Sequence, residues 1–323
     1  MHFTGTSPGQ AYDLEVVLTE LLAKAEKAEA AGVRVREHPS VAFYRGDRPA
    51  RVQMPPQDGG DVRQTDSCMY VIALHQALLP PCEGVVPTEE QQSARMSSSD
   101  GLELLRVNWE WLLWLLMPSV RLGSPTNGKE ECNNNNNNND DEEQSASAPI
   151  CSTRELCRKL EWGDYTQLRQ PGLMDRVHYS YVVFLRFYGW RLHDEERGVL
   201  DRHQNWKERY KLLSRACDIS GGSRSSSKTD EHEGNGDGHA SSIGFYDALT
   251  RILYVLLELC FTRYAVNLVA FLLEEMNKGR LLFLQPTLEK VWFSQVDCCK
   301  QVADAEKKRL RRQLYCLTHS DSD

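Results

Sequence analysis

Apolar residues recur at helical spacing through much of the chain. Leu14, Val17, Leu18 and Leu21 repeat at i, i+3, i+4 and i+7, which predicts an amphipathic helix over residues 10–31. Sustained alternation of apolar and polar positions, the pattern of a half-buried strand, does not occur. The sequence therefore predicts an all-α fold, a single multi-helix domain with orthogonal or bundle-like packing. The same periodicity predicts further helices over residues 66–79, 102–117, 171–189, 206–216, 245–259, 263–277 and 288–317.

Residues 102–117 differ from the other predicted helices because they are apolar around most of the helix circumference. A helix of this kind has no face for solvent, so we expect it to be central and buried. Pro118 follows it and ends it. Further along, Ser152 and Glu155 have the spacing of a capping box, which predicts that a helix begins there.

Polar segments interrupt this pattern at about residues 80–100, 123–149 and 220–242. The second contains seven consecutive asparagines followed by acidic residues, and the third is rich in Gly, Ser and Asp. Such compositions bury too little apolar surface to offset the chain entropy, so we expect disordered inserts. The predicted organisation is an N-terminal helix over 1–39, a main domain over 40–296, and a basic C-terminal helix or tail over 297–323.

Composition narrows the classes of function. The 323 residues carry a net charge of −8, which argues against general nucleic-acid binding because that requires a basic face. The ten cysteines include no CxxC pair, so we expect no zinc site and no cofactor. The start of the chain lacks an apolar secretory segment, and no apolar run is free of charges for about 20 residues. We therefore expect an intracellular protein without a transmembrane span.

Two polar groups are candidates for chemistry. His193, Asp194, Glu195 and Glu196 form either a metal or acid–base site or a solvated loop after a helix end. We favour the loop, because four adjacent side chains cannot all point at one ion. Cys298 and Cys299 form either a redox pair or an incidental neighbouring pair, and a bridge between adjacent residues is strained. We therefore predict that the protein is not an enzyme, with a metal-dependent enzyme as the third alternative.

A compact basic run lies near the C-terminus. It is either a nuclear-import signal or contact for an acidic partner, or a solvated helix end where cations favour the helix dipole. Both interpretations stay open. The residues are Lys307, Lys308, Arg309, Arg311 and Arg312.

Aromatic residues gather on two predicted helices. At helical spacing such residues either form the core or line a peptide groove, since aromatic side chains dominate recognition sites. We predict a groove between the two helices that grips an aromatic-containing peptide. Its residues are Trp109, Trp111, Trp114, Tyr181, Phe184, Tyr188 and Trp190.

The order and spacing of several motifs resemble the conserved region of the opioid growth factor receptor (OGFr) family. The resemblance covers about residues 40–296 and is closest in the Phe187-Tyr188-Gly189 segment. The sequence departs from the family pattern at Trp109, where the family has His, and at Leu113, where it has Gln. The matching residues are Phe43, Tyr44, Arg45, His75, Trp114, Pro118, Phe187, Tyr188, Gly189, Thr250, Arg251, Ile252, Leu253, Phe271, Glu274 and Glu275.

The resemblance implies an all-α domain whose animal relatives are receptors for an enkephalin-type growth peptide, associated with nuclear and perinuclear membranes. We therefore expect a non-enzymatic protein that binds a peptide or protein, in the nucleus or cytoplasm, with peripheral membrane association implied by the family. The alternative is an intracellular scaffold or ribonucleoprotein-associated module, in which the basic C-terminal helix contacts the partner.

Overall fold

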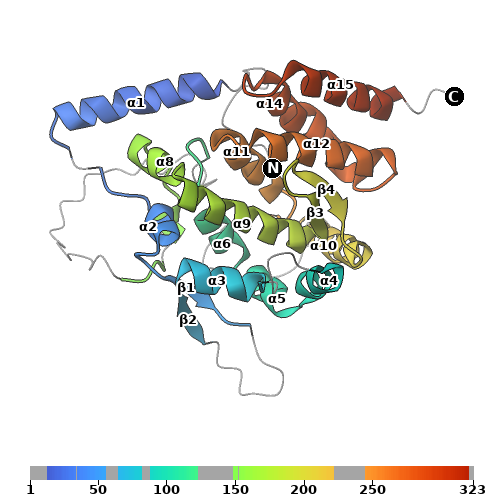
Figure 1. The fold of residues 1–323 in the computed structure, drawn as a ribbon, viewed down its shortest axis with the longest axis horizontal. Helices are drawn as coiled ribbons and strands as arrows, with labels where there is room; N and C mark the ends of the chain where they lie inside the picture. Colours follow the sequence, from blue (N-terminus) through green and yellow to red (C-terminus); the bar gives the residue numbers. More distant parts are fainter. Residues whose placement is uncertain are drawn as a thin grey trace, which may run out of the picture.

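A long helix, α9 (Pro171–Tyr188), runs through the middle of the molecule, and the other elements pack around it (Figure 1). The computed structural model describes residues 13–33, 35–55, 65–81, 88–122, 148–151, 153–221 and 244–319. Helices dominate these residues, which confirms the predicted all-α class. Pro171 occupies the first turn of α9, where its missing N–H costs nothing.

The first half of the chain alternates short helices with one hairpin. Its longest helix, α1, lies at the edge of the molecule, away from the core (Figure 1). The elements before α9 are α1 (Leu14–Ala30), α2 (Pro39–Arg45), β1 (Ala50–Gln53), β2 (Asp66–Met69), α3 (Val71–Leu78), α4 (Glu89–Ser97), α5 (Asp100–Val107), α6 (Trp109–Leu116), α7 (Thr153–Leu156) and α8 (Trp162–Leu168).

The second half begins with a hairpin and continues with helices that pack beside one another. The elements after α9 are β3 (Trp190–Asp194), β4 (Val199–Arg202), α10 (Trp206–Gly221), α11 (Ala248–Glu258), α12 (Thr262–Asn277), η1 (Leu282–Leu284), α13 (Gln285–Thr287), η2 (Leu288–Trp292), α14 (Phe293–Cys298) and α15 (Asp304–His319). In this half α15 packs on α12 and α14, with Leu310 fully buried. The segment predicted as a C-terminal helix or tail therefore adjoins the helices of the main domain.

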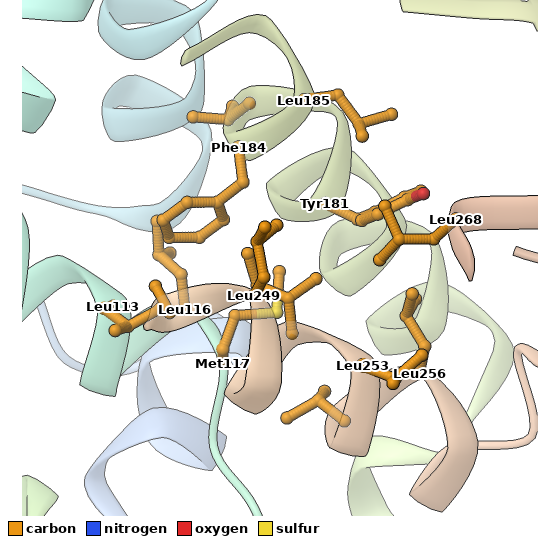
Figure 2. Close-up of a cluster of buried hydrophobic side chains, with 14 of the residues drawn as sticks. Leu113, Leu116, Met117, Tyr181, Phe184, Leu185, Leu249, Leu253, Leu256 and Leu268 are labelled. Carbon is orange, nitrogen blue, oxygen red and sulfur yellow. The ribbon is translucent and has the colours of Figure 1, made fainter. Parts of the chain in front are cut away.

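The core lies where α6, α9, α11 and α12 meet. Figure 2 shows side chains from these four helices pointing toward one another, and all of them are buried. Burial of this apolar surface is the main source of stability. The labelled residues are Leu113, Leu116, Met117, Tyr181, Phe184, Leu185, Leu249, Leu253, Leu256 and Leu268.

The predicted helix over 102–117 is two helices, α5 and α6, which meet at Asn108. The Asn108 side chain accepts a hydrogen bond from the backbone N–H of Gln53 (2.8 Å) and donates to the Gln53 and Leu104 carbonyls. A polar residue in an apolar run has thus turned toward β1 and interrupted the helix. The central position predicted for this segment is confirmed, since most of its apolar residues are buried.

Two hairpins are present that the hydrophobic pattern did not predict. In the first, β1 pairs antiparallel with β2, from Ala50 opposite Met69 to Gln53 opposite Asp66. Residues 66–69, predicted as the start of a helix, are therefore a strand. In the second, β3 pairs with β4 directly after Gly189. Each strand has four or five residues, too few for alternation to be distinguished from helical spacing.

Other differences lie in the polar and C-terminal segments. Helix α4 falls within residues 80–100, which were predicted to be disordered. Thr88 and Gln91 form a capping box at its start, and Met96 is buried. The predicted helix over 288–317 is broken between Cys298 and Asp304, with η2 and α14 before the break and α15 after it. The predicted inserts at 123–149 and 220–242, and Ser152 of the predicted cap, lie largely outside the described residues.

Candidate functional site

The aromatic residues predicted to line a peptide groove form part of the core. Trp109 stacks on Phe187 with ring centroids 4.5 Å apart, and Tyr188 stacks on Trp190 at 4.8 Å. Trp111 is half-buried, whereas Trp109, Trp114, Tyr181, Phe184, Tyr188 and Trp190 are buried. The rings themselves fill the space between α6 and α9, so the predicted groove is not open among the described residues.

The residues that resemble the OGFr family pattern are called signature residues below. Two of them, Tyr44 and His75, meet in a buried hydrogen-bond chain centred on Ser180. The Ser180 hydroxyl lies 2.8 Å from both the Tyr44 hydroxyl and His75 Nε2, and Tyr44 donates to the Leu116 carbonyl at 2.7 Å. Burial lowers the pKa of His75 to about 3, with a further contribution from the charge of Arg176. This neutral chain links α2, α3, α6 and α9. Ser180 and His75 are a serine–histidine pair, and both side chains are buried.

Signature residue Arg251 occupies a second buried polar cluster. Its guanidinium lies 4.2 Å from the centroid of the Trp114 ring and donates to the Met117 carbonyl at 2.6 Å. Nearby Glu258 accepts hydrogen bonds from the Ser119 hydroxyl and the Val120 N–H. These contacts fix the chain as it leaves α6 through buried Pro118.

The third buried cluster contains signature residue Glu275. Trp190 Nε1 donates to the Tyr210 hydroxyl (2.8 Å), which donates to Glu275 (2.9 Å). Arg280 and Arg202 pair with the same carboxylate at 3.1 and 3.5 Å. This cluster reaches from the core to the surface, unlike the first two.

The remaining signature residues also have structural contacts. Phe43, Ile252 and Leu253 are buried, and Phe271 packs edge-on against Trp190. Arg45 makes a bidentate pair with Glu37, and Thr250 accepts a hydrogen bond from Trp292. Glu274 is exposed and pairs with Lys278. Most of these residues thus pack or pair inside the fold, whereas Glu274 lies at the surface.

The residues proposed for metal or acid–base chemistry, 193–196, lie on the β3–β4 hairpin, and the two adjacent cysteines lie at the end of α14. His193 and Glu196 are exposed, Asp194 accepts a hydrogen bond from the Arg197 N–H at the hairpin turn, and Glu195 lies 3.8 Å from His178. In the part of the chain that the structure describes, no group of three His, Cys, Asp or Glu side chains is arranged to hold a metal ion.

The neighbouring cysteines of α14 differ in their surroundings. Cys299 is buried, donates to the Gln301 side chain, and has its pKa raised by burial, whereas Cys298 is half-buried. A raised pKa makes the Cys299 thiol less nucleophilic.

The basic run lies on α15, and its residues differ in exposure. Arg309 pairs with Glu306 (2.7 Å), and Arg311 pairs with Asp297 of α14 (2.9 Å). Lys308 and Arg312 are exposed, whereas Lys307 is half-buried. Two of the five cations therefore have acidic partners within the fold.

A groove of about 410 Å³ lies between α15 and the η2–α14 segment. Its lining consists of Glu289, Phe293, Arg311, Leu314, Tyr315 and Thr318. The four residues from α15 have i, i+3, i+4 and i+7 spacing, so they share one helix face. The sequence contained this signal, but η2 and α14, the opposite wall, could not be placed beside it from periodicity alone.

A comparison with known protein families finds a match to part of the chain. Residues 160–218 match the family model described as the opioid growth factor receptor (OGFr) conserved region. The resemblance to the OGFr family is confirmed over this segment, which contains Phe187, Tyr188 and Gly189, whereas the resemblance predicted for residues 40–159 and 219–296 stays a prediction. The matched segment runs from the start of α8 through α9 and the β3–β4 hairpin into α10. OGFr is not a known enzyme family. No curated protein and no solved structure matches the chain.

The structure also bears on membrane insertion. Among the residues that it describes, no helix combines the length and apolar character needed to cross a bilayer.

Proposed function

We propose that this OGFr-like protein is a non-enzymatic peptide- or protein-binding module, and that the groove between α15 and η2–α14 receives the partner. The observation that carries the proposal is the groove itself, a shallow, open and mainly apolar depression around Phe293, Leu314 and Tyr315. The tyrosine side chain is 63% exposed although it adjoins an apolar floor. Partly exposed aromatic residues beside apolar pockets are frequent anchors in interfaces.

The charge around the groove supports a partner segment with apolar and acidic side chains. Lys308, Arg311, Arg312 and Tyr315 have i, i+3, i+4 and i+7 spacing, so cations adjoin the tyrosine along α15. Lys308 and Arg312 are exposed. Acidic residues flanking an apolar anchor would complement this face and favour encounter.

The same face suits the scaffold alternative, because the basic helix would then contact the partner. By family analogy we also propose opioid-peptide receptor activity and a nuclear or perinuclear location. An exposed basic face on α15 is compatible with nuclear import.

The test is selection of peptides from a displayed random library on the full chain, followed by fluorescence anisotropy with the selected peptides and an enkephalin-type peptide. We expect enriched peptides to combine apolar anchors with acidic residues. Leu314→Asp should weaken their binding at least about tenfold, because a charge would enter the apolar floor. Tyr315→Ala, at a largely exposed position, should weaken it without unfolding risk.

Cys316→Asp is the matched control, since it adds the same charge at an exposed position of α15 outside the groove lining. It should bind like the wild-type protein. Equal loss in Cys316→Asp and Leu314→Asp, or selected peptides that bind Leu314→Asp normally, would show that the groove is not the binding site. If the enkephalin-type peptide binds the wild-type protein and Tyr315→Ala weakens that binding, the result would support receptor activity at this groove.

A further inference from the structure

A cationic cradle surrounds Trp206 at the start of α10, within the segment that matches the OGFr family. The guanidinium of Arg202 lies 4.8 Å from the ring centroid, that of Arg280 5.0 Å, and Lys207 Nζ 5.7 Å. Three elements contribute, because Arg202 ends β4, Lys207 lies in the first turn of α10, and Arg280 follows α12. Arg280, far from Trp206 in sequence, thus joins two cations that are close to the ring in sequence.

A buried carboxylate holds the two arginines of this Trp206 cradle in place. Glu275, only 1% exposed, pairs with both and is itself fixed by the Tyr210 hydroxyl. These ion pairs engage Nε of Arg202 and Nη1 of Arg280. A guanidinium has five N–H donors in a rigid fork, so each arginine keeps further donors for a ligand. With side chains 24–26% exposed, both reach solvent.

The charge of the cradle fits a doubly charged anion. Three cations against the single Glu275 carboxylate leave two positive charges. Among the residues that the structure describes, the neighbouring Asp201 pairs with Arg191 and accepts a hydrogen bond from the Arg202 backbone N–H, and Glu208 acts on Arg209. Trp206 and Lys207 lie in the first turn of α10, where the positive end of the dipole of a 16-residue helix also favours an anion. A phosphoryl group carries nearly two negative charges at neutral pH and three acceptor oxygens.

We propose that the Trp206 cradle binds a phosphoryl oxyanion presented by a phosphorylated peptide segment. The arginine forks, brought together by Glu275, would bind its oxygens, and Lys207 would add charge at the rim. This site is separate from the proposed groove on α15. Each can therefore fail without the other.

The experiment is isothermal titration of the full chain with a short phosphoserine peptide, the same peptide bearing serine, inorganic phosphate, and a single-stranded oligonucleotide. We expect the phosphoserine peptide to bind at least about tenfold more tightly than its serine counterpart. The Arg202→Lys/Arg280→Lys protein keeps both charges but loses the forks, so its affinity should fall about tenfold. Lys207→Gln, at an exposed position, should lower affinity about threefold.

Arg197→Gln is the control, because it removes a cation that is 82% exposed on the neighbouring hairpin turn. Unchanged binding in Arg197→Gln, with losses in the cradle variants, supports the proposal. If inorganic phosphate competes with the peptide, the oxyanion is the recognised group. The proposal is overturned if serine and phosphoserine peptides bind alike, if only the oligonucleotide binds, or if Arg197→Gln loses as much affinity as Lys207→Gln.

Discussion

Gly189 shows how one residue of the signature acts on the fold. It ends α9 with φ +79°, in the left-handed region, and its N–H bonds to the carbonyls of Leu185 and Arg186. A Cβ placed there would lie 2.9 Å from Trp206 Cα and 3.0 Å from Arg209 Cβ. The absence of a side chain therefore serves both the turn and the approach of α10 to α9.

Gly189→Ala should lower the free energy of unfolding by about 3 kcal/mol, combining left-handed strain with overpacking. Gly279 separates the two effects, because it has φ +73° but a Cβ added there would meet nothing within 4 Å. Gly279→Ala should cost only about 1 kcal/mol. Urea unfolding of both variants measures the difference. Equal losses would show that the close approach of α10 adds no constraint.

His75 makes stability depend on pH. Its pKa of about 3 in the folded protein lies below the ordinary value of 6.5, so the unfolded chain takes up a proton that the folded chain does not. The contribution of His75 to the free energy of unfolding is therefore complete above pH 6.5 and decreases as pH falls below that value. Between pH 7 and 5 the loss should be about 2 kcal/mol. His75→Gln should remove that loss in paired unfolding curves, whereas His319→Gln, at an exposed position, should leave the wild-type profile.

At the scale of elements, the long periodic segments were predicted well and their breaks were not. The helices α9, α11 and α12 follow the predicted ranges closely, because many apolar positions fix their period. The breaks depend on tertiary partners, as when Asn108 bonds to Gln53 across 55 residues. The candidate groove could not be predicted for the same reason, because it too depends on a tertiary partner. The apolar face of α15 is visible in sequence, but not the wall that Phe293 provides.

Arg186 connects α9 with the ends of α3 and α4, so replacing it should destabilise mainly these elements. Buried in α9, it donates hydrogen bonds to the carbonyls of Leu78, Met96 and Ser98, at the ends of α3 and α4. Arg186→Leu should cost about 3 kcal/mol, because these carbonyls would lose a charged donor. Hydrogen exchange should rise most in α4. Arg106→Leu, at an exposed position of α5, is the control, and uniform exchange in both variants would argue against this role.

At the scale of the whole molecule, α1 is attached to parts of the chain far from it in sequence. Lys300 pairs with Asp13 (2.9 Å) and Glu15 (2.8 Å), and Lys24 pairs with Glu161, the N-cap residue of α8 (2.7 Å). Leu14 is buried, but most of α1 is exposed. The attachment thus combines a small apolar contact with ion pairs at the surface, which contribute little individually.

Lys300→Glu should therefore loosen α1 while leaving the core folded. Repulsion from Asp13 and Glu15 should raise hydrogen exchange in α1 and speed proteolysis between residues 31 and 38, with little change in the main unfolding transition. Lys27→Glu makes the same charge change at an exposed position on α1 itself. Faster cleavage in both variants would point to helix fraying in place of lost attachment.

The ion pair between Glu15 and Lys300 spans 285 residues. A ribosome synthesises α1 well before its partner lysine, so this contact cannot form until Lys300 has left the exit tunnel. Helices α9, α11 and α12 can pack before Lys300 has left the exit tunnel. Helix α1 is thus made before these helices, but its attachment is completed only after them, when Lys300 becomes available.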